Sequence, residues 1–264
     1  MIMHKNQTIL AIGDCHVEVG ESIERFKWLG QYILKAKPDI IVIIGDFLSL
    51  DCLSSWDKNK RLKMEGLRYA HEIDLGKLAL KHMFKPMKEY NKKRREQHKS
   101  GYQPRFVFVE GNHENRLPRY LEEHPELEGT MDIYEDLQLE LLHAQWVSYD
   151  DYLEIEGIQF CHIPFAKNGR PIGRMHICKQ ALELSAKSVV FGHTHKGTWE
   201  NMYRIGAEHL QQALNIGCFF EHQPDYVAGA PSDYWRGVML LETYDYQRFD
   251  FSTVSLSRLR AEYG

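Results

Sequence analysis

Residues 8–16 read TILAIGDCH and residues 39–46 read DIIVIIGD, and these two stretches set the architecture of the chain. Each is a short run of aliphatic residues that ends at a Gly-Asp pair. Such runs are typical of strands that are buried on both faces of a parallel sheet. Between them, residues 21–35 place apolar side chains at helical spacing, and Pro38 ends that helix. The segment therefore predicts a β-α-β unit.

The same pattern recurs three times further along the chain. Residues 105–110 (RFVFVE), 158–162 (IQFCH) and 188–191 (SVVF) are apolar runs that lead into polar turns. Ligands of open α/β sheets bind outside the carboxyl ends of the strands, so we expect these turns to meet at one edge. Residues 237–242 and 249–254 predict a closing antiparallel meander. The fold class is therefore α/β.

The composition is that of an ordinary globular protein. The chain has 264 residues, of which 43% are hydrophobic and 27% are charged, and it is long enough to bury a full core in one domain, residues 1–264. No run approaches the roughly 20 apolar residues of a membrane helix, and the start lacks the apolar core of a signal peptide. The five cysteines are scattered, as is usual where thiols stay reduced. We expect a soluble, cytoplasmic protein that makes no membrane contact.

Two regions fall outside the strand-and-turn pattern. Residues 54–101 are strongly charged, with KNKRLK at 58–63 and KKRREQHK at 92–99, and they predict a solvated helical insertion between the second and third strands. Residues 198–233 contain several aromatics, glycines and a proline, and they predict loops beside the site. The insertion also has apolar positions that could form a homodimer surface: Leu80, Met83, Phe84 and Met87.

Side chains that bind metals are concentrated in the turns that follow the strands. Five of the fourteen histidines lie there, with two aspartates and an asparagine. Imidazole and carboxylate groups bind first-row divalent metals, and an amide oxygen serves where charge must be limited. Two side chains at positions i and i+2 of an extended segment point the same way, so Asp14 with His16, and His193 with His195, can each hold one ion. The set is large enough for two cations.

In their order and position these turns resemble the calcineurin-like metallophosphoesterases. The pattern of that family is DxH, GDxx, GNH(D/E), a lone H and GHxH, and all five blocks occur here between residues 14 and 195. The resemblance implies a layered β-sandwich core flanked by helices. It does not extend to the chain beyond about residue 200 or to the insertion at 54–101.

The resemblance also implies a binuclear metal centre whose ligands come from all five blocks. Manganese is the first expectation, and iron, zinc, nickel and cobalt also suit mixed nitrogen and oxygen ligands. One metal would be bound by Asp14, His16 and His195, the other by Asn112, His162 and His193, and Asp46 would bridge them.

Three further residues receive catalytic roles. By the same resemblance, His113 is the histidine that binds no metal and approaches the scissile ester, and Glu114 would orient it. Arg116 could clamp a phosphate oxygen through its planar guanidinium group.

The charge of this centre indicates the reaction. Two divalent cations bring four positive charges, and two aspartates with one bridging hydroxide remove three, which leaves a pocket that favours a phosphate ester. We therefore expect hydrolysis of a phosphomonoester or phosphodiester by a metal-bridging hydroxide. Nucleotides, nucleic-acid ends and phosphorylated small molecules all fit this expectation.

Two other functions also fit the sequence. The first is a DNA or RNA nuclease whose basic insertion contacts the nucleic-acid backbone, although the formal net charge of −4 gives the whole surface no strong attraction for polyanions. The basic residues are Lys58, Lys60, Arg61, Lys63, Lys92, Lys93, Arg94 and Arg95. The second is a non-enzymatic scaffold that binds partners, but such proteins usually lose ligands that are all present here.

The second block departs from one branch of the family, the protein serine/threonine phosphatases, and the substrate class stays open. Residues 45–51 read GDFLSLD, whereas the protein serine/threonine phosphatases of the family have GDxVDRG with an arginine. The missing arginine disfavours dephosphorylation of proteins.

Overall fold

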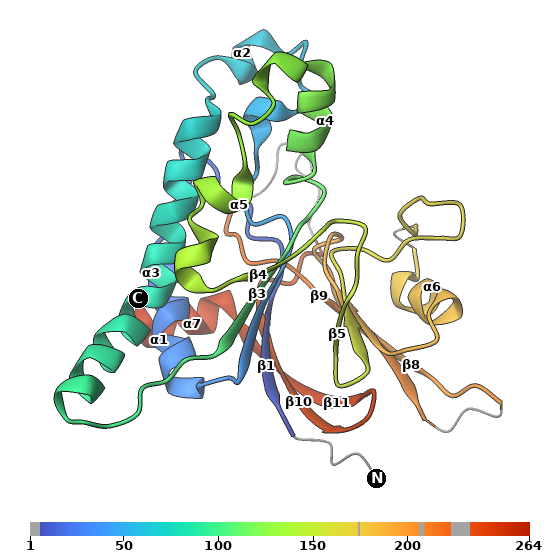
Figure 1. Cartoon of the computed structure of the whole chain (residues 1–264). Coiled ribbons are helices and arrows are strands. Elements are labelled where there is room, and N and C mark those ends of the chain that lie inside the picture. The colour runs from blue at the N-terminus through green and yellow to red at the C-terminus, as the bar shows by residue number, and fades with distance from the viewer. Residues whose placement is uncertain (1–5, 174, 206–208, 223–232) are drawn as a thin grey trace.

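The computed structural model contains two β-sheets that pack face to face (Figure 1). It describes residues 6–173, 175–205, 209–222 and 233–264, apart from the side chain of Arg61. The six-stranded sheet has the order β11 (Arg248–Ser255), β10 (Gly237–Asp245), β1 (Thr8–Ile12), β2 (Ile40–Ile44), β3 (Arg105–Val109) and β4 (Gln145–Val147). The five-stranded sheet has the order β5 (Leu153–Ile155), β6 (Ile158–Phe160), β7 (Val189–Phe191), β9 (Gln211–Ile216) and β8 (Gly197–Met202).

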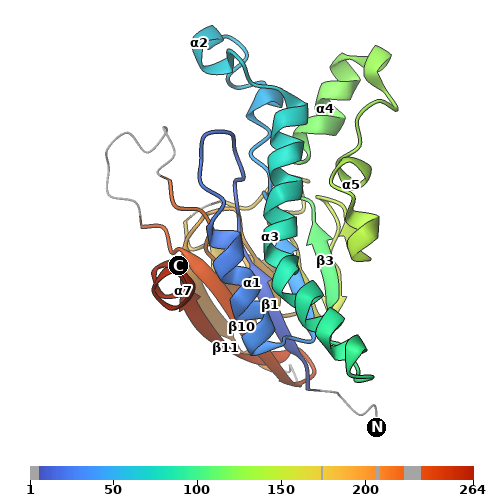
Figure 2. The same ribbon diagram turned by 90° about the vertical axis from the view of Figure 1, so that its left-hand side faces the viewer.

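Helices cover the outer faces of both sheets. The first sheet is covered by α1 (Arg25–Ala36), α3 (Tyr69–Glu96) and α7 (Leu256–Tyr263), and the second by α6 (Ile177–Leu184) (Figures 1 and 2). The shorter elements are η1 (Asp51–Leu53), α2 (Arg61–Met64), α4 (Arg116–Glu123), η2 (Pro125–Leu127), α5 (Ile133–Asp136) and η3 (Leu139–Leu142). Within the described part of the chain, no helix has both the length and the apolar character needed to cross a bilayer.

Alternation along the strands explains the four layers. In β2, Ile41 and Ile43 pack against the helices, whereas Ile40, Val42 and Ile44 pack against the second sheet. Successive side chains of a strand point to opposite faces, so a strand between two layers needs apolar residues at every position. The uninterrupted run IIVII therefore forms a central strand, and the expected layered α/β sandwich is confirmed.

The carboxyl ends of strands from both sheets meet at one edge of the molecule. β1, β2 and β3 are parallel neighbours in the first sheet, and β6, β7 and β9 are parallel neighbours in the second. A bridge between Asp14 and Cys218 joins the two sheets there. The predicted meander of β10 and β11 is also present. The polar turns therefore lie together at one edge of the molecule, and they follow strands of two different sheets.

Residues 198–233 do not form only loops, which corrects the prediction. The segment contains part of β8 and all of β9, and every residue of β9 is buried. The strand begins with two glutamines, so it lacks the apolar pattern of a buried strand. Gln212 is satisfied inside the protein, because its side chain donates to the carbonyl of Phe249 at 3.0 Å and accepts from the Phe249 amide at 3.0 Å. Residues 206–208 and 223–232 lie outside the described residues.

Residues 54–101 are helical, as predicted, but they are not a solvated insertion. They contain the four-residue α2 and the 28-residue α3, and α3 packs lengthwise against α1 (Figure 2). Ile73, Leu80 and Met83 recur at helical spacing and are buried in the core. Leu80, Met83 and Phe84 are therefore not available for a homodimer surface. The charged residues conceal this apolar face in the sequence because they occupy the rest of the helix.

We expect Met83→Ala to lower the free energy of unfolding by about 2–5 kcal/mol, because Met83 is fully buried between α3 and α1. Chemical denaturation measures this change. The matched control is Leu78→Ala on the same helix, where the side chain is 40% exposed and the cost should be well below 1 kcal/mol. Equal effects of the two substitutions would contradict the packing of α3.

Candidate metal centre

The backbone of the polar turns is held in an uncommon conformation. His16, Asp46, His193 and His195 have φ angles of 42°, 48°, 68° and 62°, in the left-handed region that side chains other than glycine rarely adopt. Such residues cost on the order of 1–3 kcal/mol each and are concentrated at functional sites. The placement of these four side chains therefore lowers the stability of the fold.

Glycines allow two of the turns to touch. Gly45 has a φ of 81°, and a Cβ at this position would lie 2.7 Å from the Cα of Gly111 and 2.7 Å from Nδ1 of His162. No side chain fits that space. The turns after β2 and β3 can approach only because both carry glycine before the polar residue.

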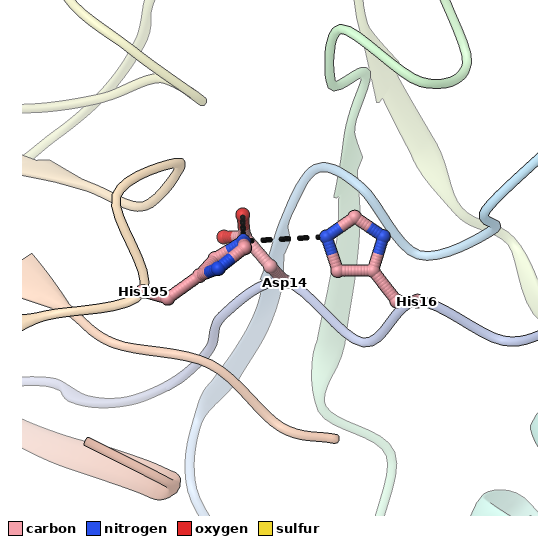
Figure 3. Close-up of side chains that lie close together, drawn as sticks. All are labelled: Asp14, His16 and His195. Atoms are coloured by element: carbon pink, nitrogen blue, oxygen red, sulfur yellow. Dashed lines mark hydrogen bonds and ion pairs between the residues drawn. The ribbon is translucent and has the colours of Figure 1, made fainter. Parts of the chain in front are cut away.

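Asp14, His16 and His195 form a first group of side chains (Figure 3). Their candidate ligand atoms lie within 4.8 Å of one another, and all three residues are buried. Nε2 of His195 lies 3.0 Å from Oδ2 of Asp14 and 3.3 Å from Nε2 of His16. The turn after β1 supplies two members of this group, and the turn after β7 supplies the third.

Asn112, His162 and His193 form a second group. Oδ1 of Asn112 lies 2.9 Å from Nε2 of His162 and 2.7 Å from Nδ1 of His193, and these two nitrogens are 3.1 Å apart. His162 donates from Nδ1 to the carbonyl of Ile44 at 2.8 Å. That bond leaves Nε2 of His162 to face the other members of the group, which is how a second hydrogen bond orients a metal-binding histidine.

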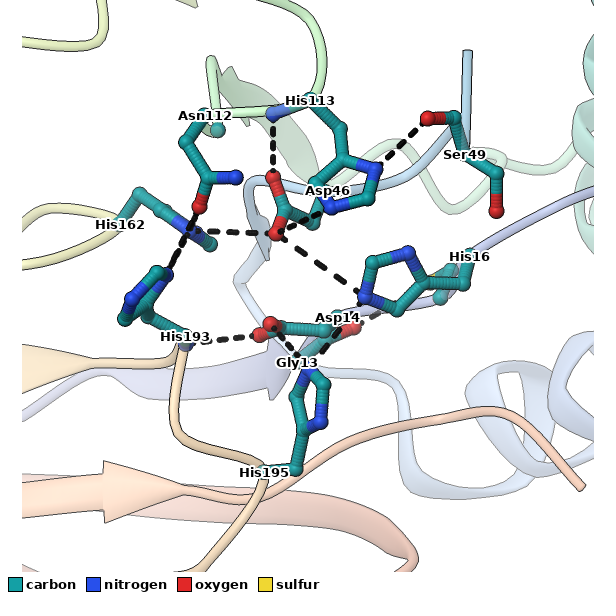
Figure 4. Close-up of polar contacts among 12 residues, drawn as sticks. Gly13, Asp14, His16, Asp46, Ser49, Asn112, His113, His162, His193 and His195 are labelled. Atoms are coloured by element: carbon teal, nitrogen blue, oxygen red, sulfur yellow. Dashed lines mark hydrogen bonds and ion pairs between the residues drawn. The ribbon is translucent and has the colours of Figure 1, made fainter. Parts of the chain in front are cut away.

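Asp46 lies between the two groups (Figure 4). Its Oδ2 is 3.3 Å from Nε2 of His162 in the second group and 3.9 Å from Nε2 of His16 in the first. Its Oδ1 accepts a hydrogen bond of 2.9 Å from the amide of His113. One carboxylate oxygen of Asp46 therefore faces both groups, while the other is held by the backbone.

The pKa values of Asp46 and its neighbouring histidines favour the binding of cations. Burial opposes ionisation of Asp46, but the imidazoles of His162 and His113 hold the pKa of this carboxyl well below its usual range. Burial and the neighbouring His113 ring lower the pKa of His16 well below its usual value. Burial lowers the pKa of His162, but Asp46 outweighs this effect and raises it to about 9. The neighbouring imidazoles thus favour the ionised form of Asp46, and a bound cation would favour it in the same way.

The residues present fit two divalent metals. Oδ2 of Asp14 is fully buried and accepts no hydrogen bond from the described residues, although Nε2 of His195 lies 3.0 Å away. In the second group, an amide oxygen and two imidazole nitrogens converge within 3.1 Å. Converging acceptor atoms repel one another unless a proton or a cation lies among them. Each group therefore offers three ligands, with Asp46 beside both.

Glu114 does not orient His113, which corrects the prediction. Its carboxylate is fully buried and accepts hydrogen bonds from the amides of Asp46 and Gly111 at 2.9 Å each and of Leu48 at 2.8 Å. Backbone amides compete for the carboxylate because the turns leave them without other acceptors. Glu114 thus joins the turn after β2 to the turn after β3.

The carbonyl of Ser49 orients His113 instead. Nδ1 of His113 lies 2.6 Å from this oxygen, and Nε2 lies 3.3 Å from Nη2 of Arg116. Nη1 of Arg116 donates to the carbonyl of Ser49 at 2.8 Å and to Oδ1 of Asp51 at 2.9 Å. Neither Ser49 nor Asp51 was singled out from the sequence. A backbone acceptor leaves no side-chain signal, and the partner of Asp51 lies 65 positions away.

The comparison with protein families agrees with this geometry. The model of the calcineurin-like phosphoesterases matches residues 7–197, which is most of the chain. The chain belongs to this family. Members of the family bind divalent metals and act on phosphate esters, and the two ligand groups of the chain lie within the matched residues. The chain is thus a member of the calcineurin-like phosphoesterase family with a candidate binuclear metal centre.

Solved structures show more distant similarity. Vps29 from Entamoeba histolytica in complex with Zn²⁺ is 13% identical, with a TM-score of 0.40 over 94% of this chain and 99% of that one. The nuclease MPE from Pseudomonas putida is 13% identical, with a TM-score of 0.35 over 88% of this chain and 83% of that one. Vps29 from Chaetomium thermophilum is 9% identical, with a TM-score of 0.38 over 94% of this chain and 97% of that one. Among curated proteins, none matches the chain by sequence.

We expect Glu114→Gln to lower the free energy of unfolding by about 1–3 kcal/mol and to weaken metal binding. The substitution places an amide NH₂ against backbone N–H donors and leaves at least one of them without an acceptor. Chemical denaturation and metal analysis of the purified protein measure the two effects. The control is Glu123→Gln, at an exposed position of α4. A Glu114→Gln variant with unchanged stability and full metal content would contradict the role of Glu114.

Proposed function

We propose that this protein hydrolyses a phosphomonoester or a phosphodiester at a binuclear metal centre. The observation that carries the proposal is the placement of Asp46 between two three-ligand groups, with His113 and Arg116 beside them. When bound, a pair of divalent cations neutralises phosphate charge and makes water a nucleophile at neutral pH.

The proposed ligands are those that the family pattern implies. Asp14, His16 and His195 would hold the first cation, and Asn112, His162 and His193 the second, with Asp46 shared. Manganese is the proposed metal, and iron, zinc, nickel and cobalt have the same preference for mixed imidazole and carboxylate ligands.

His113 and Arg116 are proposed to act on the substrate. His113 lies 3.9 Å from Asp46 through Nε2, and its side chain is 18% exposed, so it can reach an ester oxygen held above Asp46. Its Nδ1 donates to the carbonyl of Ser49, which aims Nε2 at that position, where the imidazolium form of His113 would give its Nε2 proton to the leaving oxygen and become neutral imidazole. Arg116 is tethered through Nη1, and its Nη2 is beside the same imidazole nitrogen. Arg116 would hold a phosphate oxygen there. Residues 45–51 of the second block contain no arginine that could do so.

The opening of the site supports this arrangement. Asn112, His113 and His193 are partly exposed, whereas Asp14 and His162 have no exposed surface. A phosphate group would therefore enter on the side of the turn after β3 and meet His113 first.

The nuclease alternative gains no support from the basic residues of α3. The run at 92–99 begins at the carboxyl end of α3 and leads to the start of β3 (Figure 1). The site lies at the other end of that strand. Near α2, Lys58 pairs with Glu123, and Lys60 and Lys63 pair with Asp57. Arg61 is another of the predicted basic residues, and its side chain lies outside the described part of the chain.

The non-enzymatic alternative is disfavoured because every proposed ligand position carries a residue that can bind a metal, and because the position of the catalytic histidine carries His113.

Asp46→Asn should reduce hydrolysis at least about 100-fold and lower the number of metals bound per chain, because an amide cannot supply the negative charge between the two groups. The measurements are turnover of p-nitrophenyl phosphate and its bis ester with Mn²⁺, and elemental analysis. Asp250→Asn, at an exposed position of β11, is the control. Wild-type protein that binds two metals but cleaves no phosphate ester would sink the proposed function.

Arg116→Met should lower kcat/KM about 10- to 100-fold while the metal content stays at two, since Arg116 is proposed to contact phosphate and not metal. The same loss should not follow Arg119→Met, which changes an exposed arginine of the same helix. An Arg116→Met variant with full activity would remove Arg116 from the proposed mechanism.

A further inference from the structure

Arg25 is a buried arginine at the first position of α1. Its side chain is 1% exposed and donates only to backbone carbonyls among the described residues. Nε donates to the carbonyl of Phe219 at 2.8 Å, Nη2 to the carbonyl of Cys15 at 2.8 Å, and Nη1 to the carbonyl of Ser22. The guanidinium group therefore joins three segments of the chain.

One of these segments carries two proposed ligands of the first metal. Cys15 lies between Asp14 and His16, and the amides of Cys15 and His16 donate to the carbonyl of Asp46 at 2.8 and 2.9 Å. Arg25 binds the carbonyl of the same residue, Cys15. The turn is thus held through both its amides and its carbonyl, which maintains the left-handed backbone of His16.

A second segment packs against the imidazoles of the first group. The amide of Phe219 donates to the carbonyl of Asp14 at 2.7 Å, while its own carbonyl accepts from Arg25. The next ring, Phe220, lies edge-on to His16 at 5.2 Å and to His195 at 5.0 Å. By fixing Phe219, Arg25 also fixes the aromatic side chain that limits rotation of both imidazoles.

The charge of Arg25 argues against a general role in stability. Burial lowers the pKa of its guanidinium group, and none of the described carboxylates forms an ion pair with it. A buried charge that is compensated by carbonyls and by the ring of Phe26, 4.9 Å from the guanidinium carbon, but by no ion pair, is unfavourable compared with an apolar side chain of similar size. A residue that served packing alone would therefore not need to be arginine.

We propose that Arg25 is a positioning residue for the first metal site, Asp14, His16 and His195. This inference rests on the proposed function, because it assigns a role toward a metal of that same centre. The second group takes its members from the turns after β3, β6 and β7, and Arg25 donates to none of these turns. Arg25 reaches the second group only indirectly, through Asp46 and through the His193 amide that donates to Oδ1 of Asp14 at 3.0 Å, so its loss should weaken the first site much more than the second.

The test separates the two sites by removing one ligand at a time. Asn112→Ala leaves the first site to be measured, and His195→Ala leaves the second. Arg25→Met and Arg25→Lys are added to each background, and Mn²⁺ and Zn²⁺ affinity is measured by competition with a chelator. Arg204→Met is the matched control, because Arg204 also donates to two carbonyls, those of Leu182 and Ser185, but lies beside α6.

We expect Arg25→Met to weaken binding about 10- to 100-fold in the Asn112→Ala background and less than about 3-fold in the His195→Ala background, the size usual for residues that orient metal ligands. Arg25→Lys should lie between wild type and Arg25→Met, because an ammonium group cannot reach all three carbonyls. Arg204→Met should change neither site.

Equal losses at both sites, or no loss at the first site, would overturn the proposal. If Arg25→Met does not fold, Arg25→Lys decides the question in the same two backgrounds. If neither variant folds, Arg25 supports the whole protein and the assignment to one site is wrong. Wild-type protein that binds no metal would instead refute the proposed function, so the two failures are distinguishable.

Discussion

The buried carboxylate of Asp46 organises the whole site. Asp46 is 2% exposed, and its negative charge must be compensated where water cannot do it. The imidazoles of His16, His113 and His162 surround it, and its backbone carbonyl binds the turn after β1. An anion so placed requires positive charge at the point where the two sheets meet. Protons can supply part of that charge, and divalent cations supply it more fully.

Holding the ligands around Asp46 has a cost in backbone strain, which the fold offsets with hydrogen bonds from outside the ligand groups. Four ligand residues have left-handed backbone conformations. Glu114 binds three amides of the adjacent turns, and Arg25 binds the carbonyls of Cys15 and Phe219. Both are buried ionisable side chains that bind backbone rather than each other. They convert flexible turns into fixed ones, which a metal centre needs if its ligands are to be preorganised.

The region around His113 differs from the protein phosphatase pattern in a physically coherent way. The second block has no arginine, but Arg116 at the start of α4 brings a guanidinium group to His113 from another direction. Asp51, the last residue of that block, holds Arg116 in place. The carboxylate of Asp51 therefore fixes the orientation of the guanidinium group. The position next to the proposed catalytic imidazole is thus positively charged.

The central strands and the candidate ligand set could be predicted from the amino-acid sequence without knowledge of any contact. The runs TILAI, IIVII and RFVFV are local signals, and the polar turns follow them directly. Other features depend on contacts that exist only in the folded chain. β9 is a strand because β7 and β8 pair with it on either side, despite its opening glutamines. Glu114 and Arg25 act on backbone atoms, which every sequence shares, so no pattern of side chains could reveal their partners.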